Sequence, residues 1–226
     1  MIGTGARRIG ILGGTLDPIH RGHLDAAHAA RRALGLHRVV VVPSRVPPHR
    51  AQGPEASAYH RFAMAALAAA DLDGMEVSDE ELASNGPSYT ALTLERLGAR
   101  GLARSQIFFI TGADAFAEIA TWHHYPAVLD LAHFVVVSRP GAPVAMLPGR
   151  LPELRGRMRP VDGGRPVLEE PSILLIDAPT AAVSSTEIRL RLRTGESIRG
   201  LVPPSVESHI LRHGLYSATP TADRLQ

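Results

Sequence analysis

The chain has 226 residues, which is enough for one domain with a substantial core. It contains no cysteine, so disulfides and thiolate zinc sites are excluded, and we expect a reducing, cytoplasmic location. No apolar run approaches the roughly 20 residues of a membrane span, and we find no signal-peptide pattern. The formal net charge of +2 is too small to indicate a nucleic-acid partner. The sequence therefore favours a protein that acts on neither membranes nor nucleic acids.

The 24 basic side chains are all arginine, because the sequence contains no lysine. A phosphate-loop lysine, a Schiff-base lysine and a lysine general base are thereby excluded. Any bound phosphate must be held by arginine, histidine, hydroxyl or backbone N–H groups.

Apolar runs of strand length alternate along the chain with segments of helical periodicity. Such alternation predicts a Rossmann-like, doubly wound α/β fold, in which a parallel sheet carries helices on both faces. We expect a single domain over 1–226 with its core over about 8–216, an elaborated loop at 140–171, a small C-terminal helical part and a frayed tail at 218–226. Strands are expected at 8–13, 39–42, 75–78, 106–111, 133–138 and 172–176, and helices at 22–34, 58–70, 88–99, 184–193 and 204–212, with a short helix near 151–156.

Four polar motifs follow directly after predicted strands. They are GGTLDP, PSRVPPHR, TGAD and SRPG. Parallel sheets bind ligands beyond the carboxyl ends of their strands, so these motifs are expected to meet at one edge of the sheet. The functional site is predicted there.

The most informative motif is GGTLDPIHRGH, residues 13–23, at a strand-to-helix junction. Gly13 and Gly14 allow the backbone to approach a ligand closely. His20 and His23 lie three residues apart at the start of a helix, where free N–H groups and the helix dipole favour anions. The motif predicts a phosphate site. A zinc site is disfavoured, because no further ligand cluster accompanies the two histidines.

A second motif, SSTEIR, occupies residues 184–189. Ser184 or Ser185 can cap a helix, and Glu187 can close a capping box, which by itself would explain the pattern. Hydroxyl and N–H groups at this helix start, with Arg189 one turn later, also suit a second anion site. Two anion sites indicate one polyphosphate held between them.

The pair GGTLDPIHRGH and SSTEIR resembles the signature of the HxGH nucleotidyltransferases. More narrowly, the chain resembles bacterial nicotinate-nucleotide adenylyltransferases over about residues 9–216, through further segments that include PSYT at 87–90 and TWH at 121–123. The resemblance implies that the phosphate of nicotinate mononucleotide attacks the α-phosphorus of ATP and that pyrophosphate leaves, on the pathway to NAD.

The same resemblance implies roles for individual residues. It places the acceptor's ring on Trp122 and the ribose of ATP on Asp114, and it brings Mg²⁺ in as the ATP complex, without a metal ligand from the protein. A homo-oligomer is left open. The implied catalytic residues are His20, His23 and Arg189; those for ATP are Gly13, Gly14, Thr15, Asp114, Ser185 and Thr186; those for the acceptor are Ser44, His49, Arg50, Thr90, Trp122 and Arg139.

Three positions depart from the family pattern. Leu16 and Val183 are apolar replacements for the usual Phe and Ile, whereas Arg50 replaces a Lys and keeps the charge but not the geometry. The rival readings are a transferase of the same superfamily that uses nicotinamide mononucleotide, phosphopantetheine or CTP, and a non-catalytic nucleotide-binding regulator. PSYT and TWH favour the nicotinate branch, and the intact HxGH motif argues against a regulator.

Overall fold

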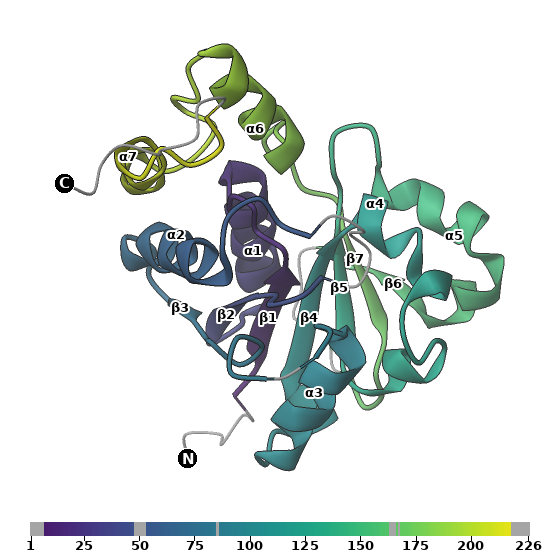
Figure 1. Ribbon diagram of the computed structural model, residues 1–226. Helices are drawn as coiled ribbons and strands as arrows, with labels where there is room; N and C mark the ends of the chain where they lie inside the picture. The colour runs from purple at the N-terminus through teal and green to yellow at the C-terminus, as the bar shows by residue number, and fades with distance from the viewer. Residues whose placement is uncertain (1–6, 48–52, 85, 163–165, 167, 218–226) are drawn as a thin grey trace.

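The protein is built around one seven-stranded sheet, seen in a computed structural model that describes residues 7–47, 53–84, 86–162, 166 and 168–217. The strand order is β3-β2-β1-β4-β5-β7-β6, and every neighbouring pair is parallel (Figure 1). This confirms the predicted doubly wound parallel sheet. The strands are β1 (Ile9–Gly14), β2 (Arg38–Pro43), β3 (Met75–Val77), β4 (Ile107–Gly112), β5 (His133–Val137), β6 (Met158–Pro160) and β7 (Ile173–Ile176).

Helices cover both faces of the sheet. Those that pack into one face's core are α1 (Arg21–Leu34), α2 (Ala58–Ala70), α6 (Ser185–Thr194) and α7 (Pro204–Arg212). The other face carries α3 (Thr90–Ala99), α4 (Ala113–Phe116) and α5 (Leu147–Arg150). Short 3-10 helices complete the connections: η1 (Arg104–Gln106), η2 (Ile119–Thr121), η3 (Ala127–Asp130), η4 (Val144–Met146) and η5 (Pro152–Arg157).

Strand β4 shows how one apolar run serves two cores. Its side chains alternate, so that Phe108 and Ile110 join the core under α1 while Ile107 and Phe109 join the core under α3. Both faces are buried, and the strand is therefore apolar from Ile107 to Ile110 instead of alternating with polar residues.

The strand order reverses between β1 and β4. From β1 the chain proceeds outward to β2 and β3, and from β4 it proceeds in the other direction. A crevice opens beyond the carboxyl ends of the strands at such a switch point. Gly14 and Gly112, which end β1 and β4, therefore mark the place where a ligand is expected.

The segment 140–171 contains more regular structure than the elaborated surface loop that we predicted there. It contributes η4, α5, η5 and the edge strand β6, and only η5 matches the short helix expected near 151–156. Leu147, Leu151, Leu154 and Met158 are buried. The three-residue β6 escaped prediction because it ends in Pro160, which is tolerated in a strand only where no ladder hydrogen bond is needed, as at an edge.

The C-terminal helices α6 and α7 lie above α1 and α2 in Figure 1. Helix α7 packs on α2, where His60 Nδ1 and His209 Nε2 are 3.1 Å apart and the Ser205 hydroxyl donates to the Leu67 carbonyl. Past α7, the Tyr216 hydroxyl reaches Asp17 in the loop between β1 and α1. The C-terminal part is thus tied to the switch-point loop. Across the described residues, every helix is too short or too polar to span a membrane.

Candidate active site

The loop from β1 to α1 brings the two motif histidines together. His20 is the N-cap of α1, its backbone N–H donates to His23 Nδ1 at 3.2 Å, and the two rings stack with centroids 3.7 Å apart. His20 Nδ1 is buried and has no hydrogen-bond partner among the described residues. The helix start therefore presents an unused imidazole nitrogen, whereas the backbone N–H groups of Arg21 and His23 already donate to the carbonyls of Leu201 and His20.

Burial keeps both rings uncharged. It lowers the pKa of His20 to about 3, helped by the nearby positive charge of Arg139. Burial also lowers the pKa of His23 well below its usual range, with smaller contributions from His20 and Arg139. At neutral pH these side chains can therefore offer N–H donors to a phosphate, but not positive charge.

Arg139 supplies the positive charge at this point. A Cβ at Gly22 would come within 2.6 Å of its Nη1, and a Cβ at Gly112 within 3.0 Å of its Cγ, so both glycines make room for its side chain. Its Nη2 donates to the Val183 carbonyl at 3.2 Å. Arg139, which was predicted to bind the acceptor, lies near the two histidines. Asp114 lies close by, since its Oδ1 is 2.4 Å from the same Cβ position at Gly112.

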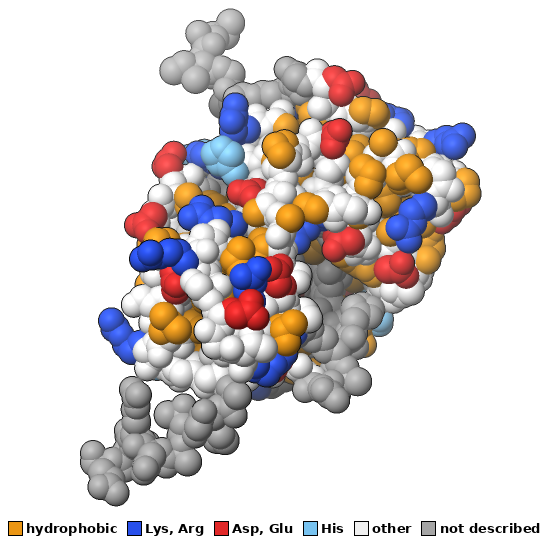
Figure 2. Space-filling model, turned by 90° about the horizontal axis from the view of Figure 1, so that it is seen from above, with side chains coloured by type: hydrophobic (Ala, Val, Ile, Leu, Met, Phe, Trp, Pro, Cys, Tyr) orange, Lys and Arg blue, Asp and Glu red, His pale blue; other side chains and the backbone are white. Residues whose placement is uncertain are grey.

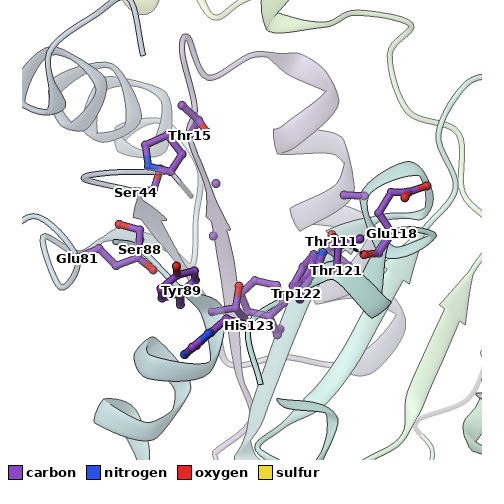
Figure 3. Close-up of a pocket in the computed structure, with 16 residues that line it drawn as sticks. Thr15, Ser44, Glu81, Ser88, Tyr89, Thr111, Glu118, Thr121, Trp122 and His123 are labelled. Atoms are coloured by element: carbon purple, nitrogen blue, oxygen red, sulfur yellow. Dashed lines mark hydrogen bonds between the residues drawn. The ribbon is translucent and has the colours of Figure 1, made fainter. Parts of the chain in front are cut away.

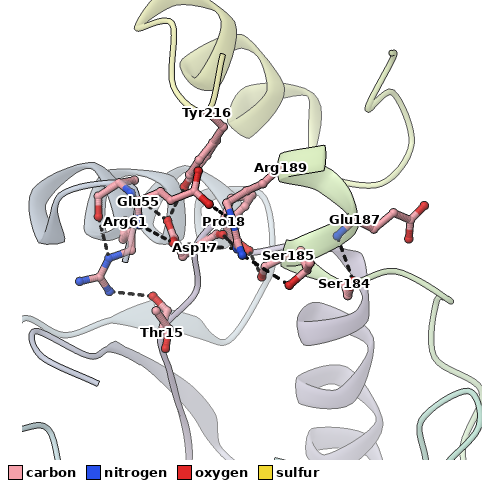
Figure 4. Close-up of polar contacts among 12 residues, drawn as sticks. Thr15, Asp17, Pro18, Glu55, Arg61, Ser184, Ser185, Glu187, Arg189 and Tyr216 are labelled. Carbon is pink, nitrogen blue, oxygen red and sulfur yellow. Dashed lines mark hydrogen bonds and ion pairs between the residues drawn. The ribbon is translucent and has the colours of Figure 1, made fainter. Parts of the chain in front are cut away.

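The SSTEIR segment begins α6 and lies against the β1–α1 loop (Figure 4). Ser184 is the N-cap and accepts from the Glu187 N–H at 3.1 Å, whereas the Glu187 carboxylate bonds to Arg191 instead of closing the capping box. The Ser185 hydroxyl donates to the Pro18 carbonyl at 2.9 Å. The structure thus brings the two predicted anion motifs together.

Arg189 is buried and bonded to protein groups. Its Nε contacts the Glu55 carboxylate at 2.7 Å, its Nη1 donates to the Asp17 carbonyl at 2.7 Å, and its Nη2 lies 3.4 Å from the Thr186 hydroxyl. Glu55 also pairs with Arg193. A phosphate that approaches Arg189 from the side of Nε would therefore compete with Glu55.

Asp17 lies at the centre of this network and is fully buried. Its carboxylate accepts from the backbone N–H groups of Glu55 and Ala56 at 2.9 and 3.1 Å and from the Tyr216 hydroxyl at 2.8 Å. Burial, followed by the charge of Asp17, raises the pKa of Tyr216 far above its usual range. Neither Asp17 nor Tyr216 was predicted to have a role, although both lie in segments that carry the family resemblance.

A cavity of about 570 Å³ opens beside the glycine loop (Figure 3). Trp122 packs edge-on against Phe109, with centroids 6.0 Å apart, and the Tyr89 and His123 rings stack at 4.1 Å. Such walls suit a flat ring. The cavity lining includes six of the predicted site residues: Gly13, Gly14, Thr15, Ser44, Thr90 and Trp122.

The other predicted site residues that the structure describes do not line this cavity. His49 and Arg50 lie outside the described residues. The remaining ones lie around the starts of α1, α4 and α6: His20, His23, Asp114, Arg139, Ser185, Thr186 and Arg189.

Glu81 is a cavity residue that the sequence motifs did not indicate. It is buried, it lines the cavity, and its Oε1 accepts from the Thr93 hydroxyl at 2.6 Å. Its position depends on α3 packing against the segment after β3, which no local pattern encodes. Within the described part of the chain, no group of three histidine or acidic side chains is arranged to hold a metal ion.

The face seen in Figure 2 carries basic and acidic side chains that are interspersed, without a continuous basic patch. Nucleic-acid phosphates are bound by clustered positive charge. That face therefore offers no support for a nucleic-acid partner.

Comparison with known proteins agrees with this geometry. A cytidylyltransferase-like family model matches residues 11–191. A Chromohalobacter salexigens protein named "probable nicotinate-nucleotide adenylyltransferase" is 43% identical over 213 residues, which covers 93% of this chain and 96% of that protein. A Moorella thermoacetica protein of the same name is 41% identical, with 92% of this chain and 91% of that protein covered.

Among solved structures, the nicotinic acid mononucleotide adenylyltransferase of Plasmodium falciparum complexed with NaAD superposes with a TM-score of 0.73. The comparison covers 93% of this chain and 97% of that one at 18% identity, so it speaks for the fold alone. The family match and the close relatives carry the assignment. The chain belongs to the cytidylyltransferase-like family and, within it, to the nicotinate-nucleotide adenylyltransferases.

Proposed function

We propose that this chain transfers the adenylyl group of ATP to nicotinate mononucleotide, giving nicotinate adenine dinucleotide and pyrophosphate in NAD synthesis. One observation carries the proposal: a cavity walled by Trp122 opens directly beside the glycine loop that leads to the paired histidines. A flat ring and a phosphate therefore have adjacent places to bind. We also propose a cytoplasmic location, which suits a cysteine-free chain.

The reaction is a direct displacement that needs no enzyme nucleophile. A phosphate oxygen of nicotinate mononucleotide bonds to the α-phosphorus of ATP, while the bond from that phosphorus to the bridging oxygen breaks and pyrophosphate departs. Catalysis is then positioning and stabilisation of charge on the phosphate oxygens. His20 and His23 would donate N–H groups to these oxygens, Arg139 would add charge beside them, and Asp114 would hold the ribose hydroxyls.

The leaving group would be held at the start of α6. The Ser185 hydroxyl there contacts Pro18, in the loop that carries the histidines, and Thr186 follows it in the first turn of the helix. Arg189 would bind the β and γ phosphates after it exchanges Glu55 for them. Pyrophosphate would thereby be stabilised as its charge develops.

The acceptor would lie in the cavity with its ring on Trp122 and its phosphate toward Ser44. The ring carboxylate would bind Thr90 and N–H groups at the start of α3, where the helix dipole favours an anion. His49 and Arg50 are proposed as further phosphate ligands on the basis of the resemblance. A carboxamide has a donor NH₂ where the acid has an oxygen, so it would place one donor against another.

Magnesium would enter with ATP. Mg²⁺ prefers phosphate oxygens and water and is commonly held by one or two carboxylates plus substrate phosphates. We therefore treat Mg–ATP as the substrate. Calorimetry without nucleotide should detect no tight magnesium site, and a sub-micromolar site would contradict this proposal.

A panel assay tests the function directly. ATP and CTP are each combined with nicotinate mononucleotide, nicotinamide mononucleotide and phosphopantetheine, and pyrophosphate release is measured. We expect turnover to be highest with ATP and nicotinate mononucleotide. Glu81 and Glu118, which both line the cavity, favour the amide instead, because a carboxylate could accept from its NH₂ group. Equal use of acid and amide would contradict the nicotinate preference, and no turnover with any pair would favour a non-catalytic regulator.

A further inference from the structure

Arg61 is a buried cation on α2 that no motif indicated. Its side chain is among the largest of the fully buried ones, with 1% of its surface exposed. A buried guanidinium is costly unless its N–H groups are bonded. In this fold several of its hydrogen bonds go to backbone carbonyls rather than to side chains: Thr15 at 2.7 Å, Ser44 at 2.5 Å, Ala56 at 3.2 Å and Arg45 at 3.3 Å.

Two of these carbonyls belong to opposite sides of the reaction. Thr15 lies in the glycine loop before the paired histidines, and Ser44 follows β2 on the acceptor side; both line the cavity. One nitrogen, Arg61 Nη1, donates to both carbonyls. The two loops also meet directly, since the Ser44 N–H donates to the Gly14 carbonyl at 2.8 Å, and Arg61 adds a side-chain bridge beyond this contact. Figure 4 shows its contact with Thr15.

We propose that Arg61 is a positioning residue, which holds the ATP loop and the acceptor loop at the separation that the adenylyl transfer requires. The inference builds on the proposed function. Arg61 contacts the backbone of the loops, is 1% exposed and is not among the residues that line the cavity, so we expect it to act without touching either substrate. A displacement of about 1 Å between reacting groups can cost about 10² in rate, so one misplaced loop would reduce turnover strongly.

A guanidinium suits this task better than an ammonium. It offers five donors in a fixed plane, whereas lysine offers three donors on one rotating centre. Arg61→Lys keeps the positive charge but cannot hold the same set of carbonyls in one geometry. Arg61→Met removes the donors and keeps a long apolar stem.

The positioning role and a purely stabilising role predict different kinetics. If Arg61 aligns two loops that each still bind their substrate, turnover per folded molecule falls while the affinity for each substrate changes little. If Arg61 only stabilises the fold, the folded fraction falls, but each folded molecule keeps its normal turnover. The folded fraction and kcat must therefore be measured separately.

The experiment uses the full chain with Arg61→Lys, Arg61→Met and the control Arg157→Met. Arg157 also donates to two backbone carbonyls, Leu129 at 2.7 Å and Pro171 at 3.3 Å, and it does not line the cavity. The folded fraction comes from circular dichroism, acceptor affinity from fluorescence of Trp122, the only tryptophan, and kcat and the KM for ATP from pyrophosphate release.

We expect both Arg61 variants to lose about 10- to 100-fold in kcat per folded molecule, with acceptor Kd and ATP KM within about threefold of the native values. The control should keep its kcat. A kcat within twofold of native in either folded Arg61 variant would overturn the proposal, as would failure of both variants to fold at 10 °C, since Arg61 would then be structural. If the native chain uses a different acceptor in the panel, the proposed function fails, and the Arg61 comparison is made with that acceptor.

Discussion

At the scale of single residues, burial decides which chemical form each group at the phosphate site takes. His20 and His23 are neutral because the stacked rings are enclosed and lie beside Arg139. Positive charge at the site comes instead from arginines, which keep their charge when buried. The histidines therefore act as directed N–H donors and the arginines as the cations.

The histidine role predicts a large loss of rate without loss of the fold. His20→Ala or His23→Ala should lower kcat by about 10² or more, as expected when a donor to the transition state is removed. Steady-state pyrophosphate release measures kcat, and circular dichroism checks the fold. His28→Ala, on the same helix but beyond its first turn, is the matched control. Native turnover in His23→Ala would remove this residue from the mechanism.

The Glu55–Arg189 pair predicts that a variant binds ATP more tightly than the native chain. Glu55→Gln removes the charge that competes with a phosphate for Arg189, and the Glu55 side chain is 44% exposed, so the pair contributes about 1 kcal/mol at most. The Kd for ATP, measured by calorimetry, should fall by up to about fivefold. Arg189→Ala should weaken ATP and impair the reverse reaction with pyrophosphate together.

Glu187→Gln serves as the control for this prediction. It breaks an exposed pair with Arg191 on the same helix, without touching Arg189, and should leave ATP affinity unchanged. If Glu55→Gln bound ATP no better than the native chain, phosphate would not compete with Glu55 for Arg189.

At the scale of elements, helix starts position the chemistry. His20 caps α1, Thr90 opens α3 and Ser184 caps α6, so three helices begin around the ligand site. Each start presents backbone N–H groups that no helical carbonyl accepts. Some of these groups already have acceptors, as the Arg21 N–H has in the Leu201 carbonyl, so backbone groups can supply only part of the substrate binding in a chain without lysine.

The α3 start predicts how the enzyme separates acid from amide. Thr90→Val keeps the shape of the side chain but removes a donor, so kcat/KM for nicotinate mononucleotide should fall more than that for the amide. Trp122→Ala should weaken both acceptors alike, because stacking does not distinguish them. An unmade hydrogen bond in such a pocket costs roughly 1–3 kcal/mol, which corresponds to a preference of about 5- to 150-fold. An equal effect of Thr90→Val on both acceptors would place the ring carboxylate elsewhere.

Sequence patterns predicted the structure correctly where the signal for an element lies within that element. The predicted helices at 58–70 and 204–212 have the bounds of α2 and α7, and the motifs after the strands do meet at the switch point. Patterns failed where distant segments determine a side chain's role. Arg61 stands in an alanine-rich helix, and its partners come from residues 15, 44 and 56, so no local signal shows that its guanidinium is buried.

At the scale of the whole molecule, both hydrophobic cores extend from the carboxyl ends of the strands, where the ligand site lies, to their amino ends. There His133, at the start of β5, is fully buried. Its ring stacks on Phe108 at 4.8 Å and its Nδ1 accepts from the Ser172 N–H at 3.2 Å. Burial, aided by the charge of Arg8, lowers the pKa of His133 to about 4. This histidine links the stability of the fold to pH at a point remote from the substrates.

The direction of that effect follows from which state binds the proton. In the unfolded chain His133 titrates near pH 6.5, whereas in the folded protein it stays neutral down to about pH 4. As pH falls through 6.5, His133 binds a proton in the unfolded chain but not in the folded protein. The free energy of unfolding therefore falls until the pH reaches about 4. Between pH 7.5 and 5 the loss from this residue should be about 2 kcal/mol.

His133→Asn keeps an acceptor for the Ser172 N–H but cannot titrate, so its free energy of unfolding in urea should decline less over this range by about that amount. His37→Asn, at an exposed position, is the control and should decline as the native protein does. If His133→Asn and the native chain lost stability in parallel, other groups would cause the loss of stability in acid. His20 and His23, whose pKa values are also lowered, are the first candidates.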